Sequence, residues 1–233
     1  MKFSFSRLNT YETCPRRFYY RYVLGKEEPD TQPLALGRAV HKASELVLNG
    51  WDLNEAVKEG YIEADFHPEV TLEEITELVQ KAPFHEIKGE TERYFCIPLF
   101  DEENSPMLQG YIDLVDGDRI YDFKTNWSPY NIHENHQVAL YAWALSQMEG
   151  HESVHGSLLF LRFGLKSTDV FNREKMDNAI EWARGLVREI LAKLEKLQSV
   201  PGKDKELFPY KASSACGHCP FVLDCFKEFS FKK

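Results

Sequence analysis

The sequence predicts an α/β core with helical additions at both ends of the chain. Three observations predict this fold class. Residues 107–115 and 119–124 alternate around Asp116-Gly117-Asp118, which indicates a β-hairpin. A helical segment at 133–148 separates this hairpin from an apolar strand at 154–163. Further helical patterns precede the hairpin and follow the last strand, so the strands occupy the middle of the chain.

Helices are expected along the first third of the chain. Ser6 suits the N-cap of a short helix that ends near Cys14. Pro15 suits the first position of a second helix, which runs to Leu24 and stops at Gly25. A loop, 27–33, follows. The remaining elements before the hairpin are helices at 36–49, 52–66 and 71–81 and a strand at 92–99.

Beyond the last predicted strand, residues 173–197 form a long amphipathic pattern. Its apolar residues recur at helical spacing, which favours packing against a core. The tail from about Pro201 is expected to be rich in loops, and it holds three cysteines. We find no internal repeat and no low-complexity segment.

Size and composition indicate a globular protein. The 233 residues suffice for one domain with a sizeable core, and 43% of them are hydrophobic. No run of 18 apolar residues is present, so no membrane span is expected. The N-terminus lacks the apolar stretch of a secretion signal. A cytoplasmic, reducing location is therefore expected, in which five cysteines favour metal or cluster binding over disulfides.

The net charge of −9 argues, taken alone, against a nucleic-acid partner. The charge is unevenly distributed. Residues 1–26 hold six basic side chains and one acidic side chain, whereas residues 52–77 hold nine acidic side chains and one basic side chain. A basic strip near the N-terminus could therefore contact a phosphate backbone. The acidic segment is expected to be a solvated helical face.

The hairpin carries two carboxylates and a lysine. A two-residue turn at Gly117-Asp118 would place Asp113 directly opposite Asp122, and a turn at Asp116-Gly117 would make them diagonal neighbours on one face. A three-residue loop would instead separate them. Lys124 lies two residues past Asp122 and shares its face.

Two carboxylates that lie close together repel each other, and such pairs commonly bind a hard cation. Mg²⁺ or Mn²⁺ held by Asp113 and Asp122 could bind a scissile phosphate and its attacking water. Lys124 could then orient that water or neutralise negative charge in the transition state. The alternative is an exposed hairpin with polar residues on its solvent face.

Two helices carry further candidates. His41 follows Gly37-Arg38-Ala39-Val40 and could ligate a metal, although a lone helical histidine is more often structural. Gln137 and Tyr141 lie four residues apart, on one face of the helix after the hairpin. They could bind a phosphate, a base or the lysine, or they could form a polar helix edge.

Three cysteines, Cys216, Cys219 and Cys225, have C-x2-C-x5-C spacing. Cys14 and Cys96 are the candidates for a fourth ligand. Cys14 lies at a helix junction, whereas Cys96 lies in a predicted strand, so Cys14 is preferred. Four thiolates could hold Zn²⁺ or a [4Fe–4S] cluster. A single C-x-x-C knuckle favours the cluster, with a structural role that joins the ends of the chain.

Together these motifs resemble the RecB-like branch of the PD-(D/E)XK nuclease superfamily, over nearly the whole chain. The similarity extends to its iron–sulfur members, which include the AddB nuclease domain and CRISPR-associated RecB-like exonucleases. The motifs that carry it, in family order, are Phe5-Ser6-Arg7-Leu8 to Tyr11, Cys14-Pro15-Arg16-Arg17-Phe18, Tyr22, Gly37 to His41, Gly110-Tyr111-Ile112-Asp113, Asp122-Phe123-Lys124, and Gln137 to Tyr141.

The resemblance implies a central mixed sheet flanked by helices, and a role for each motif. His41, Asp113, Asp122 and the carbonyl of Phe123 would ligate Mg²⁺ or Mn²⁺. Lys124 would assist the attacking water, while Gln137 and Tyr141 would contact DNA or support the site. The [4Fe–4S] cluster would bind the four cysteines, which are Cys14, Cys216, Cys219 and Cys225.

The resemblance therefore implies a single-stranded DNA exonuclease that acts on DNA ends in repair, recombination or CRISPR adaptation. One nuclease domain is expected, with a cluster and DNA segment at 1–35, a helical region at 36–90, a core at 91–200 and a cysteine segment at 201–233. The acidic segment from about Trp51 to Pro83 could be a surface for a protein partner. The alternatives are a non-catalytic or partner-dependent DNA-end-binding adaptor with the same fold, and a zinc-stapled nuclease without iron.

Overall fold

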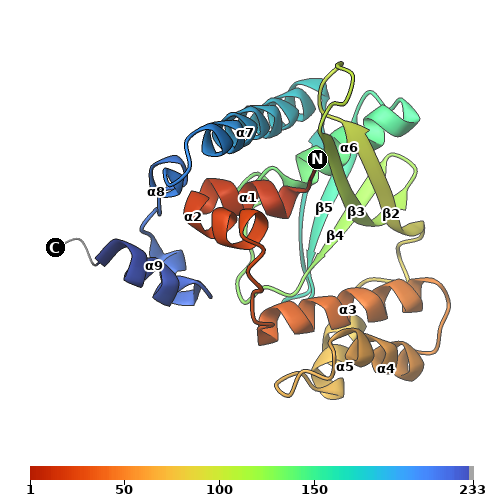
Figure 1. Cartoon of the computed structure of the whole chain (residues 1–233). Coiled ribbons are helices and arrows are strands. Elements are labelled where there is room, and N and C mark those ends of the chain that lie inside the picture. Colours follow the sequence, from red (N-terminus) through yellow and green to blue (C-terminus); the bar gives the residue numbers. More distant parts are fainter. Residues whose placement is uncertain (231–233) are drawn as a thin grey trace. The chain divides into compact units, whose positions relative to one another are not determined.

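The mixed sheet flanked by helices is present in the computed structural model, which describes residues 1–230 (Figure 1). The chain divides into two compact units. We call Asp30–Ile97 with Gln109–Ile180 the sheet unit. The cysteine unit comprises Met1–Pro29, Pro98–Leu108 and Glu181–Lys233. The single nuclease domain with its four segments stays a prediction.

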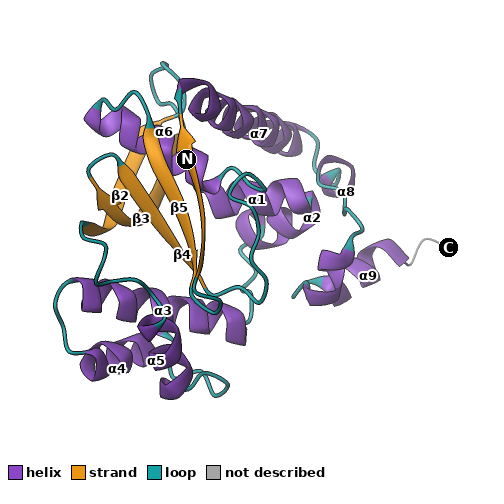
Figure 2. Ribbon diagram, turned by 180° about the vertical axis from the view of Figure 1, so that it is seen from behind, coloured by secondary structure: helices purple, strands orange, loops and turns teal. Residues whose placement is uncertain are grey.

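The sheet unit is built on β2 to β6. The order is β3-β4-β5-β6, and β2 pairs with β3 (Figure 2). β3 and β4 are antiparallel, β4 and β5 parallel, and β5 and β6 antiparallel, so the sheet is mixed. The bounds are β2 (Glu90–Pro98), β3 (Met107–Asp116), β4 (Arg119–Lys124), β5 (Val154–Phe160) and β6 (Leu165–Phe171).

The β3–β4 hairpin has the first of the two turns considered. Leu114 pairs with Tyr121, and Asp116 pairs with Arg119, so Gly117 and Asp118 form the turn. Gly117 has a φ of +57°, in the left-handed region that glycine occupies without steric cost. The hairpin prediction is therefore confirmed. Continued by one residue beyond Leu114 and Tyr121, this register places Asp113 opposite Asp122.

Three helices pack together at one end of these strands (Figure 1). They are α3 (Gln32–Leu48), α4 (Leu53–Glu63) and α5 (Leu72–Gln80), close to the predicted positions. The helix α3 begins four residues earlier than expected, because Pro33 lies in its first turn, where no backbone N–H is needed. Side chains of α3 and α5 form one hydrophobic core with Leu114, Phe123 and Leu159 of the sheet.

The helix α6 (Gln137–Glu149) begins later than the predicted start at His133. Asn131 and Asn135 explain the difference. Each accepts a backbone N–H from the residue two positions on with its side-chain oxygen, and this favours turns over helix. The helix then packs on β5, where a Cβ at Gly156 would lie 2.5 Å from Val138 Cγ1. Gly156 therefore permits the close approach of helix and strand.

The strand β6 was not predicted. The apolar stretch expected at 154–163 ends as β5 at Phe160, and Gly164, with a φ of +59°, lies in the turn that follows. Residues of β6 are largely polar and exposed, since the strand lies at the edge of the sheet. A strand without an apolar stripe gives little sequence signal.

In the cysteine unit, α1 (Phe5–Thr13) is capped by Ser4, whose hydroxyl accepts the Arg7 backbone N–H at 3.3 Å. The prediction of Ser6 as the cap was wrong, because Ser6 lies inside the first turn. A short helix, α2 (Pro15–Phe18), continues as a π-helical turn at Tyr19–Val23 and ends before Gly25. The strand β1 (Lys2–Phe3) pairs in parallel with Met107 and Leu108.

The C-terminal part of this unit is more helical than expected. It contains the part of α7 (Arg173–Ser199) from Glu181 onward, α8 (Asp204–Leu207), a 3-10 turn at Ser214–His218 and α9 (Val222–Ser230). Phe208 stacks on Phe18 and Tyr19, with ring centroids 6.3 and 5.2 Å apart. Aromatic side chains from the first and last segments of the unit therefore share one core.

Candidate functional site

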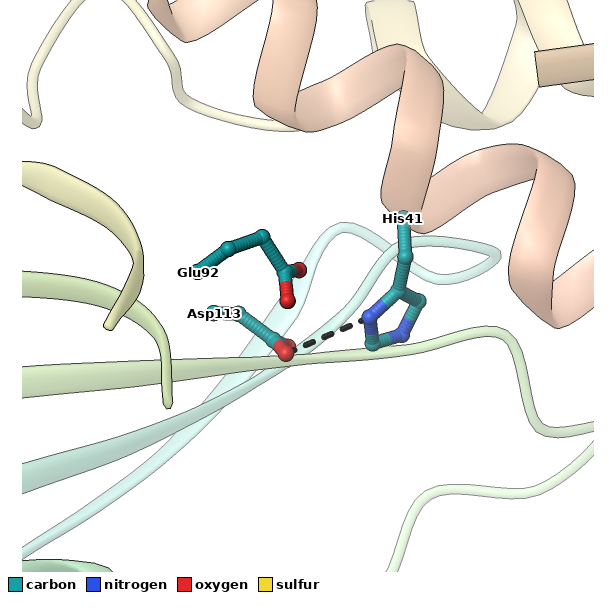
Figure 3. A group of neighbouring side chains, drawn as sticks. All are labelled: His41, Glu92 and Asp113. Carbon is teal, nitrogen blue, oxygen red and sulfur yellow. Dashed lines mark ion pairs between the residues drawn. The ribbon is translucent and has the colours of Figure 1, made fainter. Parts of the chain in front are cut away.

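His41 links the two segments that hold the predicted metal ligands. It projects from α3 toward Asp113 on β3 (Figure 3). Its Nδ1 lies 3.2 Å from Asp113 Oδ1, and its Nε2 lies 2.9 Å from the carbonyl oxygen of Phe123. The second Asp113 oxygen accepts the backbone N–H of Phe123 at 2.6 Å. The imidazole of His41 thus contacts two of the other predicted ligand groups, the Asp113 carboxylate and the Phe123 carbonyl.

Glu92 is a further member of this site that sequence reasoning missed. One ligand atom each of His41, Glu92 and Asp113 lies within 4.8 Å of the other two, a separation that suits a single cation. Glu92 has a φ of +50°, an uncommon conformation for a glutamate in a strand. Figure 3 shows its carboxylate directed toward Asp113. No spacing rule links Glu92 to the hairpin, so only the fold reveals it.

A second polar chain runs from β4 to α6. Lys124 Nζ lies 2.5 Å from Asp122 Oδ2 and donates to Gln137 Oε1 at 2.9 Å. The Gln137 amide in turn donates to the Tyr141 hydroxyl at 3.2 Å. The hairpin pair Asp122 and Lys124 and the helix pair Gln137 and Tyr141, which the sequence grouped separately, are therefore joined in one chain of contacts. Gln137 holds the ammonium of Lys124 with one end of its amide and Tyr141 with the other.

The charges of these groups depend on one another. Burial alone would lower the pKa of His41, but the Asp113 carboxylate outweighs it and raises the pKa to about 9. Burial, together with Asp113, raises the pKa of Glu92 to about 7. Burial favours a neutral Lys124, yet Asp122 raises the lysine pKa above its ordinary value. Lys124 is therefore an ammonium group.

The two hairpin acids differ in their environment. Burial disfavours the charged form of Asp113, but His41 outweighs burial and lowers the pKa of Asp113. Burial raises the pKa of Asp122 against the opposing effect of Lys124, and Asp113 adds to the rise. The Oδ2 atom of Asp122 is buried, and the Lys124 ammonium lies 2.5 Å from it.

These donors fit a hard divalent cation. Carboxylate oxygens, a carbonyl oxygen and one imidazole suit Mn²⁺ and, for the oxygens, Mg²⁺. Asp113 and Asp122 are almost fully buried, where a carboxylate needs a cationic partner, and His41 and Lys124 provide that charge in the metal-free protein. The His41 side chain is 31% exposed, so the site is open to solvent on the histidine side.

The four cysteines of the predicted cluster line one cavity of about 240 Å³ in the cysteine unit. Cys14 precedes α2, Cys216 and Cys219 belong to the 3-10 turn and its end, and Cys225 lies on α9. Burial raises the pKa of both Cys219 and Cys225, which favours neutral thiols unless a cation is bound. Cys96 lies in β2, in the sheet unit, and does not line this cavity.

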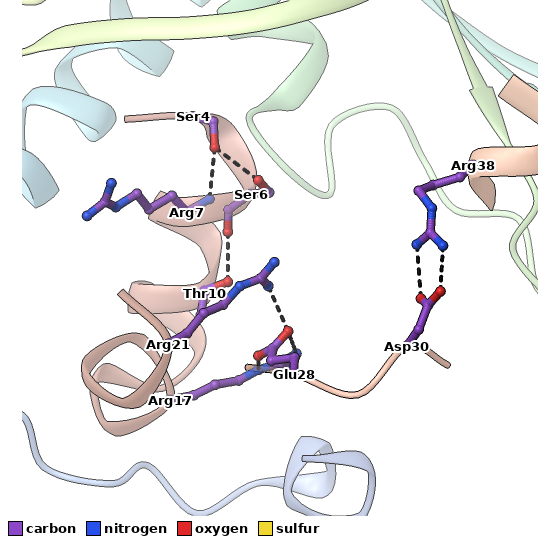
Figure 4. Close-up of polar contacts among 9 residues, drawn as sticks. All are labelled: Ser4, Ser6, Arg7, Thr10, Arg17, Arg21, Glu28, Asp30 and Arg38. Atoms are coloured by element: carbon purple, nitrogen blue, oxygen red, sulfur yellow. Dashed lines mark hydrogen bonds and ion pairs between the residues drawn. The ribbon is translucent and has the colours of Figure 1, made fainter. Parts of the chain in front are cut away.

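The basic strip of residues 1–26 is largely paired with acids. Arg17 and Arg21 both contact Glu28, as Figure 4 shows. The guanidinium of Arg16 contacts Asp204 at 2.9 Å and also Glu228, and Lys26 contacts Asp224 at 2.7 Å. Within residues 1–230, these contacts leave less free positive charge on the strip than its composition indicates.

With this geometry in view, comparison with known families gives a clear result. The family model described as "PD-(D/E)XK nuclease superfamily" matches residues 2–225. The chain belongs to the PD-(D/E)XK nuclease superfamily. This membership indicates a metal-dependent nuclease that hydrolyses phosphodiester bonds, with DNA as the substrate that the fold suggests.

Other comparisons add less. A solved structure titled "Crystal structure of SSO0001" matches 96% of this chain and 85% of that chain, at 14% sequence identity and with a TM-score of 0.47. Comparison with curated proteins gives no match. No helix within residues 1–230 of this nuclease is long and apolar enough to cross a membrane.

Proposed function

We propose that this PD-(D/E)XK nuclease is a RecB-like, iron–sulfur DNA exonuclease that cleaves single-stranded or end-bearing DNA. One observation carries the proposal. The sheet unit gathers a cation site and a lysine ammonium on one hairpin, while the cysteine unit gathers four cysteines around one cavity. Both features belong to one branch of the superfamily, and the order of the motifs agrees with that branch.

In the sheet unit, His41, Asp113, Asp122 and the carbonyl of Phe123 would hold Mg²⁺ or Mn²⁺, and Glu92 would be a fifth group near the ion. The bound ion would supply positive charge to a phosphate and to its attacking water. Hydrolysis joins the water oxygen to phosphorus, breaks the bond to the leaving sugar oxygen, and gives that oxygen a proton.

Lys124 would stabilise negative charge on the phosphate. Its raised pKa keeps it protonated, so it donates hydrogen bonds and does not accept the proton of water. The contact with Gln137, 2.9 Å long, fixes the direction of the ammonium. Gln137 and Tyr141 would therefore act as positioning residues. Their hydrogen bond would hold the amide in the orientation that Lys124 requires.

In the cysteine unit, a [4Fe–4S] cluster fits the donor set better than zinc does. Tetrahedral zinc with bonds of about 2.3 Å places its sulfur ligands about 3.8 Å apart. Among the described residues, the cysteines contribute to no group of three whose ligand atoms lie within 4.8 Å of one another. No three of the sulfur atoms thus lie as close together as tetrahedral zinc requires. A bound cluster would join the first and last segments of the unit.

The test is cleavage of end-labelled single-stranded DNA with Mn²⁺ by the full-length, iron-loaded protein. We expect metal-dependent cleavage that Asp122→Asn lowers by at least about 100-fold, because that change removes a buried ligand charge. Asp116→Asn is the matched control, since Asp116 is an exposed acid on the same hairpin, and its cleavage should stay near wild type.

Equal cleavage by Asp122→Asn and wild type would contradict the site. Absence of cleavage by clean, loaded wild-type protein, together with tight binding of DNA ends, would replace the exonuclease proposal with a DNA-end-binding adaptor. A label released as mononucleotides from one end would support the exonuclease mode, and internal cuts would contradict it.

A further inference from the structure

An exposed tryptophan lies close to the lysine of the candidate site. Trp127 follows Lys124 by three residues, so their Cα atoms are at most about 11 Å apart. Its side chain is 70% exposed, although it belongs to the large apolar residue types that proteins usually cover. Trp127 is therefore near enough to touch the same strand of nucleic acid whose phosphate meets Lys124.

Trp127 is held on one side by an arginine. The guanidinium carbon of Arg162 lies 3.7 Å from the centroid of the indole ring. Arg162 is itself fixed, because its Nε donates to the carbonyl of Thr125 at 2.8 Å and its guanidinium contacts Glu74 at 2.8 Å. One face of the indole is thus supported by a rigid cation, and the high exposure leaves the ring open to a ligand.

The surroundings of the ring suit a flat ligand, and their charged side chains are paired with one another. Trp127, Arg162 and Phe163 help to line a cavity of about 260 Å³, which is smaller than the pockets of roughly 300–1,000 Å³ that enclose whole drug-sized ligands. Its two acids are paired, Glu74 with Arg162 and Glu77 with Lys81. The same pairs compensate Arg162 and Lys81, so a nucleotide would meet an aromatic floor whose neighbouring carboxylates are already paired.

We propose that Trp127 stacks on a nucleobase of an unpaired strand and so sets the position of that strand relative to Lys124. The inference rests on the proposed nuclease function and deepens it, because it names a residue that selects unpaired bases. Bases within a duplex stack on one another and offer no free face, whereas an unpaired base can add its ring to an aromatic side chain. Arg162 holds the indole in place before a base binds, so binding loses less side-chain conformational entropy.

The experiment measures binding of the full-length, cluster-loaded Asp122→Asn protein to fluorescent oligo-dT, to an abasic strand of the same length, and to a duplex. Trp127→Ala should weaken oligo-dT binding by about 5- to 150-fold, which is the range for one lost base–aromatic stack. Trp127→Phe should retain most of the affinity. Binding of the abasic strand and of the duplex should change by less than about twofold.

Trp51→Ala is the matched control, because Trp51 is also an exposed tryptophan of the sheet unit and is remote in sequence from Lys124. Equal loss of oligo-dT and abasic binding in Trp127→Ala would overturn base stacking. Unchanged oligo-dT binding would also overturn base stacking. A protein would then be the expected partner of the exposed ring. Cleavage by the wild type with unchanged oligo-dT binding in Trp127→Ala would overturn this inference alone. Base-dependent loss of binding without wild-type cleavage would uphold stacking and overturn the nuclease proposal.

Discussion

The imidazole of His41 contacts two acceptors, an Asp113 carboxylate oxygen and the Phe123 carbonyl. Both ring nitrogens can donate only when the ring is protonated, and a pKa of about 9 agrees with that state. In the metal-free protein, His41 thus places a positive charge beside the buried Asp113 carboxylate. A metal ion at the same acids would replace this proton, since only a neutral imidazole can ligate.

This proton makes the stability of the metal-free protein depend on pH. The pKa of His41 is raised from 6.5 to about 9 on folding, so its stabilising effect is complete below pH 6.5 and is lost as the pH rises through 9. In EDTA, urea unfolding should show about 1–2 kcal/mol less stability at pH 9.5 than at pH 6 from this residue, after allowance for solvent screening.

The variant His41→Gln should lack this part of the decline. His85→Gln is the control, because the His85 side chain is 80% exposed and should leave the profile as in wild type. A decline of the same size in His41→Gln and in wild type would show that other groups cause it.

Sequence patterns predicted the site residues that are brought together by a single turn or a single helix. Asp113, Asp122 and Lys124 follow from the turn, and Gln137 with Tyr141 follows from helical spacing. Glu92 could not be found in this way. It meets His41 and Asp113 only through the pairing of β2 with β3 and a backbone in the left-handed region, neither of which has a spacing rule.

Among the elements, strong periodicity and turn chemistry predicted the hairpin, α3 to α5 and α7, while weakly patterned elements were missed. The edge strand β6 has no apolar stripe, and α9 follows a cysteine-rich turn that gives no helical start signal. The sequence also did not predict close contacts between elements, because these contacts depend on which faces of the helices and strands pack together. The crossing of α3 and α4 is an example, since a Cβ at Gly60 would lie 2.4 Å from the Ala39 carbonyl oxygen.

Because of this crossing, alanine substitutions at two helical glycines should change the stability of the protein in opposite directions. Gly60→Ala should destabilise the protein by about 1–3 kcal/mol, because backbone atoms of α3 must move to admit the methyl group. Gly185→Ala, in α7, meets nothing within 4 Å and should stabilise by about 0.5–1 kcal/mol through better helix propensity. Urea unfolding of both variants measures the difference. Equal effects would show that α3 and α4 do not approach closely at Gly60.

Across the whole molecule, the sequence predicted that the two ends of the chain meet at the cysteines, and the cysteine unit does unite residues from both. It did not predict that the 98–108 segment joins them, because this grouping depends on long-range packing. Arg16 contributes to it. Its guanidinium is almost fully buried, contacts Asp204 and Glu228, and packs over the rings of Tyr19 and Tyr20.

The cluster proposal predicts separate behaviour of the two units. Cys14→Ser should lose most of the bound iron and speed hydrogen exchange in α1, α2 and α9, because these segments would lose their common anchor. Exchange in β3 to β5 of the sheet unit should change little. Cys96→Ser is the control and should keep its iron, since Cys96 lies outside the cavity. Full iron content in Cys14→Ser would remove Cys14 from the ligand set.

The assembly of the cysteine unit from distant stretches of chain has a consequence for its synthesis. Cys225 follows Cys14 by 211 positions, so at about 5–20 residues per second a ribosome completes the set about 10–40 seconds after Cys14 is made. Over that interval α1 and α2 have neither Phe208 nor the later cysteines to pack against. The sheet unit, which ends at Ile180, can fold while the ribosome is still working. Under the cluster proposal, a newborn molecule would therefore hold a completed sheet unit before its last cysteine ligand exists.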